Sequence, residues 1–138
     1  MKSLVNQNLI GGWYCGTGRR KTSIARVFIK PGRYDVMLVN GQLLKDYFER
    51  LDHQKLVRQP ILEACPLPFV VKMNVVGGGK SGQAGAIQLG IARALVSFNP
   101  DFRRRLSKEK FLKRDSREVE RKKVGLCKAR KGKQFSKR

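Results

Sequence analysis

The alternation of apolar and polar positions predicts strands in the first third of the chain. From Ser23 to Lys30 the apolar residues Ala25, Val27 and Ile29 share one side of an extended segment, with period two. Residues 33–39 alternate in the same way. Pro31-Gly32 between the two segments has type II turn chemistry, which predicts an antiparallel hairpin. An earlier strand is expected near Trp13, after an irregular lead-in.

A helical period follows the second predicted turn, Asn40-Gly41. Leu43, Leu44, Tyr47 and Phe48 recur at helical spacing, which predicts a short amphipathic helix whose apolar residues belong to the core. Residues 51–59 are predicted to be helical in part. Pro60 is suited to the first position of a helix, so a further short helix is expected over residues 61–64.

The central segment predicts a strand, a glycine turn and a long helix. The strand spans Phe69 to Val76, and residues 77–79 are all glycine. The helix carries an apolar stripe with spacings of three and four: Ala84, Ile87, Ile91, Leu95 and Phe98. Three glycines inside this helix, at positions 82, 85 and 90, each cost about 1 kcal/mol relative to Ala. That cost indicates a close approach, either to the sheet or to a ligand backbone. Asn99-Pro100 ends the helix, and residues 101–106 are expected to form a short one.

Gly79-Lys80-Ser81 between a strand and a helix raises the question of a nucleotide-binding loop. The phosphate-binding pattern requires a glycine at position 74, where Asn74 stands, and no later strand ends in a magnesium-holding acid. These departures argue against a nucleoside triphosphatase. Glycine amides at a helix N-terminus still favour an anion, and an RNA phosphate fits as well as a nucleotide does. No other catalytic constellation is present, so we predict no enzymatic activity, no cofactor and no small-molecule substrate.

Residues 103–138 form the most strongly charged segment of the chain. This segment has seventeen Lys and Arg against four acids, and its few apolar residues follow no helical or strand period. Such a segment cannot bury enough apolar surface to order itself. It is either a solvated tail or a chain ordered by a polyanion. Gly125, Gly132 and Phe135 favour the second interpretation, because glycines adapt the backbone to a groove and an aromatic ring stacks on unpaired bases.

The rest of the chain is basic as well, and the net charge of +21 implies a polyanionic partner. Arg19, Arg20 and Lys21, with two glycines before them and two hydroxyls after, form either a phosphate-binding patch or an ordinary basic turn. The chain has no run of eighteen apolar residues, so RNA or DNA is favoured over a membrane. We therefore divide it into a body, residues 1–102 with a lead-in at 1–13, and a tail, residues 103–138.

Cysteine and histidine usage argues against a metal site. Cys15, Cys65 and Cys127 lie far apart, form no C-x-x-C pair and are odd in number, which disfavours a disulfide framework or a zinc site. Reduced cysteines in a reducing compartment are expected. The single histidine, His53, lies among polar residues and is expected on the surface. The N-terminal residues lack the long apolar stretch of a secretory signal.

Several of these motifs, in their order along the chain, resemble the family of small-subunit ribosomal protein S9. The motifs are Gly16 to Val27, Val39-Asn40-Gly41, residues 77–95, and the tail segments 114–117, 120–123, 128–131 and 134–138. The similarity covers the chain from Tyr14 onward. The ending Gln-Phe-Ser-Lys-Arg is similar to that of the bacterial or organellar branch. Gln88, Lys113 and Cys127 depart from the family pattern, and Gln88 removes one expected RNA contact.

The resemblance implies an α+β fold similar to the second domain of ribosomal protein S5. That fold has a four-stranded sheet with helices packed against it and a left-handed strand–helix–strand crossover, against the usual right-handed rule. A long, extended basic C-terminal tail would follow the body.

The resemblance also implies a function in translation. The body would dock on the 3′ major domain of the ribosomal RNA in the small-subunit head, beside other head proteins, in a cytoplasmic or organellar ribosome. The tail would thread through RNA to the P site, where Lys137 and Arg138 would contact the anticodon stem-loop of the tRNA. A generic nucleic-acid-binding protein and a small nucleotide-binding enzyme are the alternatives.

We expect the RNA contacts to be made by cations of the body and the tail together with one aromatic residue. The predicted RNA-binding residues are Arg19, Arg20, Lys21, Lys80, Arg114, Arg117, Arg121, Lys122, Lys123, Lys128, Arg130, Lys131, Lys133 and Phe135.

Overall fold

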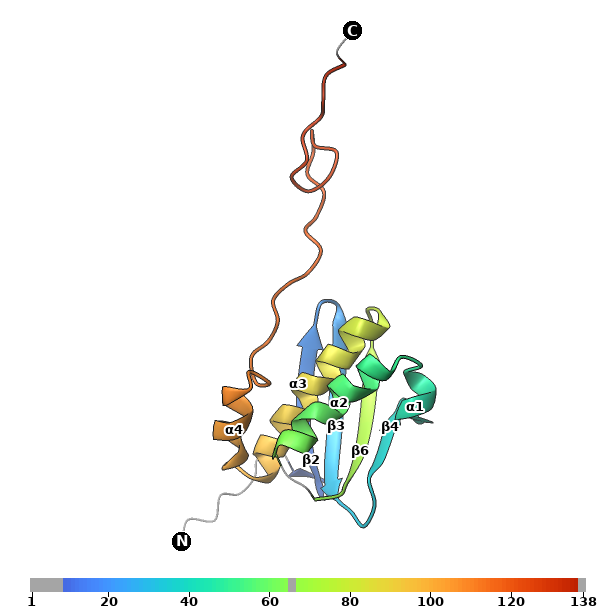
Figure 1. The fold of residues 1–138 in the computed structure, drawn as a ribbon, viewed down its shortest axis with the longest axis vertical. Coiled ribbons are helices and arrows are strands. Elements are labelled where there is room, and N and C mark those ends of the chain that lie inside the picture. Colours follow the sequence, from blue (N-terminus) through green and yellow to red (C-terminus); the bar gives the residue numbers. More distant parts are fainter. Residues whose placement is uncertain (1–8, 65–66, 137–138) are drawn as a thin grey trace.

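The structure is a computed structural model that describes residues 9–64 and 67–136, with a packed body from which the C-terminal segment extends (Figure 1). Five strands precede the first helix, and one further strand separates the helices in two pairs, so the body has an α+β fold. Their order is β1 (Leu9–Ile10), β2 (Trp13–Arg20), β3 (Ser23–Pro31), β4 (Val36–Val39), β5 (Gln42–Leu43), α1 (Leu44–Tyr47), α2 (Leu51–Ala64), β6 (Phe69–Val76), α3 (Lys80–Phe98) and α4 (Phe102–Lys108).

The strands of the described residues form one mixed sheet in the order β1-β2-β3-β6-β4-β5. Four strands were expected, and the four longer ones, β2, β3, β6 and β4, make up the centre of the sheet. The expected number is too low, because the two-residue strands β1 and β5 extend the sheet at its edges. Neighbours are antiparallel except β4 and β6, which run parallel. The chain passes from β4 to β6 through β5, α1 and α2.

The predicted hairpin between residues 23–30 and 33–39 is wrong. β6 lies between the two segments: Ile29 of β3 faces Val71, and Met37 of β4 faces Val71 from the other side. Gly32 does not have the positive φ that a type II turn needs, and its N–H donates to the Pro68 carbonyl at 3.1 Å. β6 therefore has a paired strand on each side, and its alternate residues Phe69, Val71, Met73 and Val75 are buried.

The turn at Asn40-Gly41 is confirmed. Both residues have positive φ, 49° and 85°, as a two-residue hairpin turn of type I′ requires. The Asn40 side chain also pairs with β6: its Nδ2 donates to the Val75 carbonyl at 3.0 Å, and its Oδ1 accepts from the Val75 N–H at 2.8 Å. The amide thus continues the hydrogen bonding of β4 one residue beyond the end of the strand.

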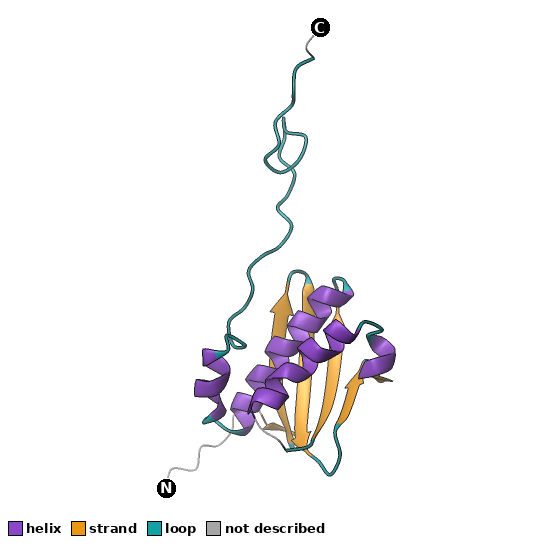
Figure 2. Cartoon of the chain, viewed as in Figure 1, coloured by secondary structure: helices purple, strands orange, loops and turns teal. Residues whose placement is uncertain are grey.

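Helices α2 and α3 lie next to each other on one face of the sheet (Figure 2). The predicted stripe on α3 is confirmed, because Ala84, Ile87, Ile91 and Leu95 are fully buried. The strand alternation is confirmed for residues 23–30, with Ala25, Val27 and Ile29 at most 1% exposed. Over residues 33–39 the apolar alternation predicts the wrong face, because Met37 and Val39 are the buried residues and Tyr34 is 72% exposed. The core therefore lies between this sheet face and the two helices.

The predicted break at Pro60 is wrong, since α2 continues through it to Ala64. Pro60 is buried, and so are Val57, Ile61 and Ala64 on the same side of the helix. A proline inside a helix costs about 3 kcal/mol through the missing hydrogen bond and the clash with the preceding turn. Packing of a continuous apolar side of α2 against the body offsets that cost.

The backbones of α3 and β2 approach each other very closely. A Cβ atom on Gly18 would overlap the Ala86 carbonyl of α3, and one on Gly16 would overlap the Gly90 carbonyl. On the helix side, a Cβ on Gly90 would lie 2.6 Å from a methyl carbon of Val27. The glycine at position 90 is therefore explained by approach to the sheet. Gly16 and Gly18 serve the same packing, whereas the sequence had associated them with a phosphate-binding patch.

The packing of the body continues past residue 102, where the sequence had divided the chain. Helix α4 packs against α2 and α3, and its Leu106 is fully buried. Phe111 and Leu112 pack against the same core. Too few apolar residues occur here for a sequence period to show, but Leu106 and Phe102 attach the short helix to the core. Helix α3 ends before Asn99, as predicted.

The close contact between β2 and α3 predicts that Gly18→Ala destabilises the protein. The added methyl group must displace the helix backbone, so we expect a loss of about 1–3 kcal/mol in the free energy of unfolding, measured by urea denaturation. Thr17→Ala is the control, because Thr17 is the exposed neighbour on the same strand. Equal stability of Gly18→Ala and Thr17→Ala would contradict the packing argument.

Candidate nucleic-acid interface

Two loops of the body meet at one end of the sheet: the β2–β3 turn and the β6–α3 loop. Gly77 and Gly78 of the second loop have φ of 72° and 64°, and a Cβ on Gly77 would lie 2.6 Å from the Thr22 carbonyl. The Ser23 hydroxyl donates to the Gly77 carbonyl at 3.1 Å. The predicted cations of the turn and the predicted glycine loop are therefore brought together.

The three consecutive cations of the turn do not form one patch. Arg20 extends over α3, so close to Gly85 that a Cβ there would overlap the Arg20 side chain. Its Nη1 donates to the Ser81 carbonyl at 3.5 Å, and its Nε is buried without a hydrogen-bond partner in the described part of the chain. Arg19 and Lys21 are exposed. Gly85 is thus explained by the passage of Arg20 across the helix.

Asp115 connects Arg20 to the start of the tail. One oxygen of its carboxylate lies 3.4 Å from Arg20 Nη2 and 3.0 Å from Arg117 Nη2. The other accepts from the Arg117 Nε at 3.1 Å and from the Arg117 backbone N–H at 3.0 Å. The predicted RNA-binding residues Arg20 and Arg117 therefore share a carboxylate, and the end of β2 is joined to the tail root, which we define as residues 109–117.

Hydrogen bonds from Arg117 hold the pKa of Asp115 well below its ordinary value of 3.8. The same hydrogen bond raises the pKa of Arg117. A carboxylate with a lowered pKa stabilises the folded arrangement fully above its ordinary pKa, and the contribution is lost as the pH falls through the lowered value. The contact between Arg20, Asp115 and Arg117 is therefore fully charged at neutral and mildly acidic pH.

A cavity of about 280 Å³ lies beside this contact, between α3 and the tail root. Arg20, Lys110 and Lys113 line it together with Asp115 and the Gln88 side chain. Gln88 also donates to the Gln59 side chain at 3.2 Å, which links α3 to α2. The residue that departs from the family pattern thus has a contact within the body.

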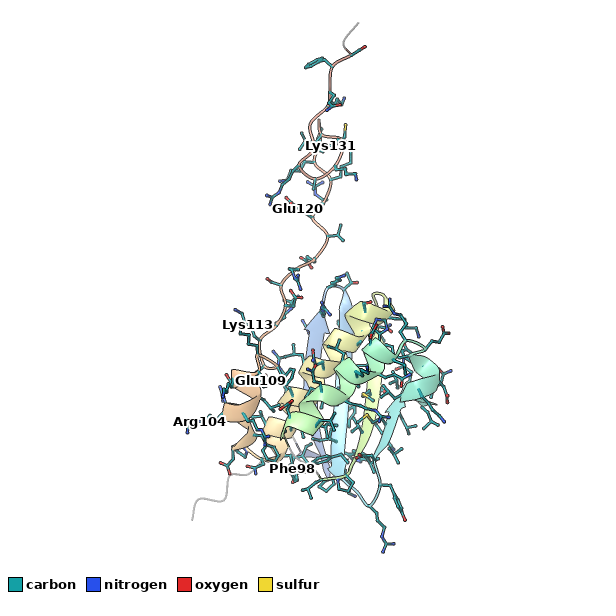
Figure 3. The ribbon with its side chains drawn as sticks, viewed as in Figure 1. Phe98, Arg104, Glu109, Lys113, Glu120 and Lys131 are labelled. Atoms are coloured by element: carbon teal, nitrogen blue, oxygen red, sulfur yellow. The ribbon has the colours of Figure 1, made fainter. Side chains whose placement is uncertain are left out.

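A second carboxylate, Glu120, organises a loop further along the tail. It lies 3.0 Å from Lys123 Nζ and 2.8 Å from Arg130 Nε. The Cys127 N–H donates to the Lys131 carbonyl at 2.8 Å, and Gly125 has φ of 81°. Figure 3 shows Glu120 and Lys131 at this loop, well away from the body. Two of the four acids of the tail therefore hold cations that the sequence had assigned to RNA.

Lys80 occupies a different environment from that of a nucleotide-binding lysine. Its Nζ donates to the Tyr47 carbonyl at 3.1 Å and lies 3.4 Å from the centroid of the Tyr47 ring. His53, expected on the surface, is half-buried and lies 3.0 Å from the Ser81 hydroxyl. Lys80 and Ser81 thus connect the start of α3 to α1 and α2. These partners are distant along the chain, so the sequence carried no signal for them.

The other predicted cations are exposed to solvent. Phe135 is 98% exposed, and six tail cations are exposed and form no ion pair with a carboxylate of residues 9–64 or 67–136. The six are Arg114, Arg121, Lys122, Lys128, Lys131 and Lys133. Lys137, Arg138 and Cys65, to which the sequence analysis also refers, lie outside the described residues.

Sequence reasoning missed one cation that protects the edge of the sheet. Arg93 of α3 donates from Nη1 to the Thr17 carbonyl of β2 at 2.6 Å. Beyond its short pairing with β1, β2 has an open edge that is available to another strand, and a charged side chain there blocks such pairing. Helical periodicity places Arg93 on the solvent side of α3 and therefore could not reveal this contact.

In the described part of the chain, no group of three or more His, Cys, Asp or Glu side chains lies close enough to hold a metal ion. In the same residues, no helix is both long and apolar enough to cross a bilayer.

We predict that Asp115→Asn loosens the tail root while leaving the body folded. Loss of the charge weakens the bonds to Arg20 and Arg117, so amide exchange of residues 113–118 should rise several-fold, as measured by hydrogen–deuterium exchange. Glu118→Gln is the matched control, since it removes one exposed carboxylate that forms no ion pair within the described chain. The same exchange rates in both variants would show that Asp115 does not anchor the tail.

Comparison with known proteins identifies the family that combines this body with a basic C-terminal segment. Residues 18–138 match the family described as Ribosomal protein S9/S16. The match begins in β2, includes the two loops and α3, and continues through the tail. The resemblance found in the sequence is therefore confirmed, and the chain belongs to the ribosomal protein S9/S16 family.

Proposed function

We propose that this protein of the small ribosomal subunit binds the ribosomal RNA of the subunit head, in the 3′ major domain, and contacts P-site tRNA with the end of its tail. The observation that carries the proposal is the exposed cationic tail attached to a packed body. Its role is structural, without catalysis, and it acts within the ribosome of a cytoplasm or an organelle beside other head proteins.

The charge arrangement in the tail supports RNA as the partner. Asp115 and Glu120 already contact two cations each, so RNA does not have to displace these acids from the remaining cations. The six predicted RNA-binding cations of the tail that are exposed and form no ion pair in the described chain can each neutralise a phosphate and release counterions. Phe135 offers an exposed ring on which an unpaired base can stack.

The attachment of the tail supports a defined path toward the tRNA. Leu106 and Phe111 anchor the segment before the tail root, and the Arg20–Asp115 contact fixes the root itself. A tail that starts from a fixed point searches less space than a free one, so less entropy is lost on binding. Lys137 and Arg138 match the end of the family pattern, and we assign them to the tRNA anticodon stem-loop.

The body contributes further contacts at the two loops. Arg19, near the end of β2, and Lys21, in the β2–β3 turn, are exposed and can bind phosphate directly. Arg20 and Lys80 have partners within the protein, so we assign them a supporting role that adds positive potential to this end of the body. The position of Lys80 on Tyr47 disfavours the alternative of a nucleotide-binding enzyme, in which this ammonium would reach the terminal phosphates.

Sedimentation of a cell lysate through sucrose at moderate salt tests the proposed assignment. We expect the chain to migrate with small ribosomal subunits and to be released progressively at high salt, because binding through several phosphates is steeply salt-dependent. Absence from the subunit fractions, together with indiscriminate binding to duplex DNA, would instead identify a generic nucleic-acid-binding protein.

Deletion of Lys137 and Arg138 should weaken P-site tRNA retention and leave subunit assembly intact. Both effects follow from placing these two cations on tRNA and the preceding ones on ribosomal RNA. The measurements are tRNA filter binding to reconstituted subunits and sucrose-gradient sedimentation of the subunits. Lys55→Ala/Arg58→Ala, two exposed cations of α2, is the control of equal charge. Equal tRNA affinity of truncated and intact subunits would disprove the assignment of the tail end.

A further inference from the structure

The face of the sheet turned away from α2 and α3 carries its own set of exposed side chains. Strand residues alternate between faces, so the neighbours of the buried Ala25, Val27 and Ile29 belong to this second face. In Figure 2, α2 and α3 lie on the opposite side. No element that the structure describes in residues 9–64 and 67–136 packs on it. We call it the open face.

The charges of the open face are all positive. The four longer strands, β2, β3, β4 and β6, contain no Asp or Glu. Arg26, Lys30 and Lys72 are exposed on the open face. Their strands, β3 and β6, are direct neighbours: Phe28, midway between Arg26 and Lys30, is paired with Lys72. Adjacent strands lie about 4.8 Å apart, so the three cations surround one small area.

Aromatic side chains are interleaved with these cations. Lys72 Nζ lies 5.0 Å from the centroid of the Trp13 ring, although β3 separates the strands of the two residues. The indole and the lysine therefore meet above β3, where Phe28 is half-buried. Ile24 and Val76, paired across the same two strands, are 37% and 64% exposed. The open face thus combines apolar surface with positive charge. The exposed surface of an isolated soluble domain would instead carry both positive and negative side chains.

The acids of the body lie elsewhere. Four of the six acids in residues 1–102 fall between Asp46 and Glu63, in and around α1 and α2. The helical side therefore has mixed charge, and the open face has charge of one sign only. A polyanion approaching the body is attracted to the open face and meets carboxylates on the helical side. The positive charge of the open face therefore favours a polyanionic partner, and it favours binding on this face over the helical side.

We propose that the open face is a second RNA-binding surface, separate from the tail, in which Arg26, Lys30 and Lys72 bind phosphates of one RNA segment. Trp13 and Phe28 lie against the sugars or unpaired bases of the same segment. Aromatic residues on an exposed sheet are one of the ways in which proteins hold single-stranded RNA. The inference rests on the proposed function, since it assigns the ribosomal RNA to a particular side of the body.

The test uses the full chain and a transcript of the 3′ major domain of small-subunit ribosomal RNA. In Arg26→Ala/Lys72→Ala, two phosphate contacts are lost, so the slope of log affinity against log salt should fall by about two. We expect binding at moderate salt to weaken about tenfold in a filter-binding assay. Lys55→Ala/Arg58→Ala, which removes the same charge from the helical side, should bind like the wild type.

Charge reversal and a folding check make the outcome decisive. Arg26→Glu/Lys72→Glu should bind more weakly still, while circular dichroism melting shows that the exposed substitutions leave the body folded. Wild-type affinity and salt slope in a folded Arg26→Ala/Lys72→Ala variant would overturn the inference and leave the proposed function standing. Normal RNA binding with loss from small subunits would overturn it too, since the open face would then meet a protein. A wild-type chain that binds no transcript and is absent from subunits would end the proposed function itself.

Discussion

The close approach of the α3 backbone to the β2 backbone is the constraint on which the rest of the molecule depends. Glycines at positions 16, 18 and 90 remove the side chains that would otherwise separate helix and strand. Two residues after Gly18 on the same side of β2, Arg20 cannot enter a core that is already filled, so its side chain crosses the helix at Gly85. Its guanidinium thereby reaches Asp115 at 3.4 Å. A packing requirement inside the body thus determines where the tail is held.

This arrangement gives different roles to cations that are equivalent in the sequence. Arg20 and Arg117 are shared by one carboxylate, Lys80 rests on Tyr47, and Lys123 and Arg130 meet at Glu120. Exposed cations such as Lys122 and Lys128 have no such carboxylate in the described chain. The acids of the basic tail therefore lower its net charge and also form ion pairs with particular cations. They hold part of the cations in place and leave the others exposed.

The sequence predicted the elements well and their arrangement less well. Period-two and helical patterns located β3, β6 and α3, because burial of one side of an element depends on local spacing. The hairpin prediction was wrong, because the turn residues Pro31-Gly32 cannot show that β6, which begins at residue 69, pairs between β3 and β4. The helix start predicted at Pro60 was wrong for a similar reason. Packing of α2 against distant residues outweighed the preference of proline for the first position of a helix. The partners of Arg20 and Lys80 also lie far along the chain, so charge and motif could propose a binding role but not locate the contacts.

The open face and the tail differ in what binding costs them. The cations of the open face stand on paired strands, so the RNA binding that we propose for them would cost little conformational entropy. In the tail, each residue fixed costs about 1–2 kcal/mol of backbone entropy, and the exposed pairs of Glu120 contribute about 0–1 kcal/mol each. Those pairs are too weak to order the tail by themselves, so in the proposed function the RNA contacts would supply the remaining free energy. A rigid cationic sheet therefore suits the first, position-setting contact, and the anchored tail suits a path completed only within the assembled RNA.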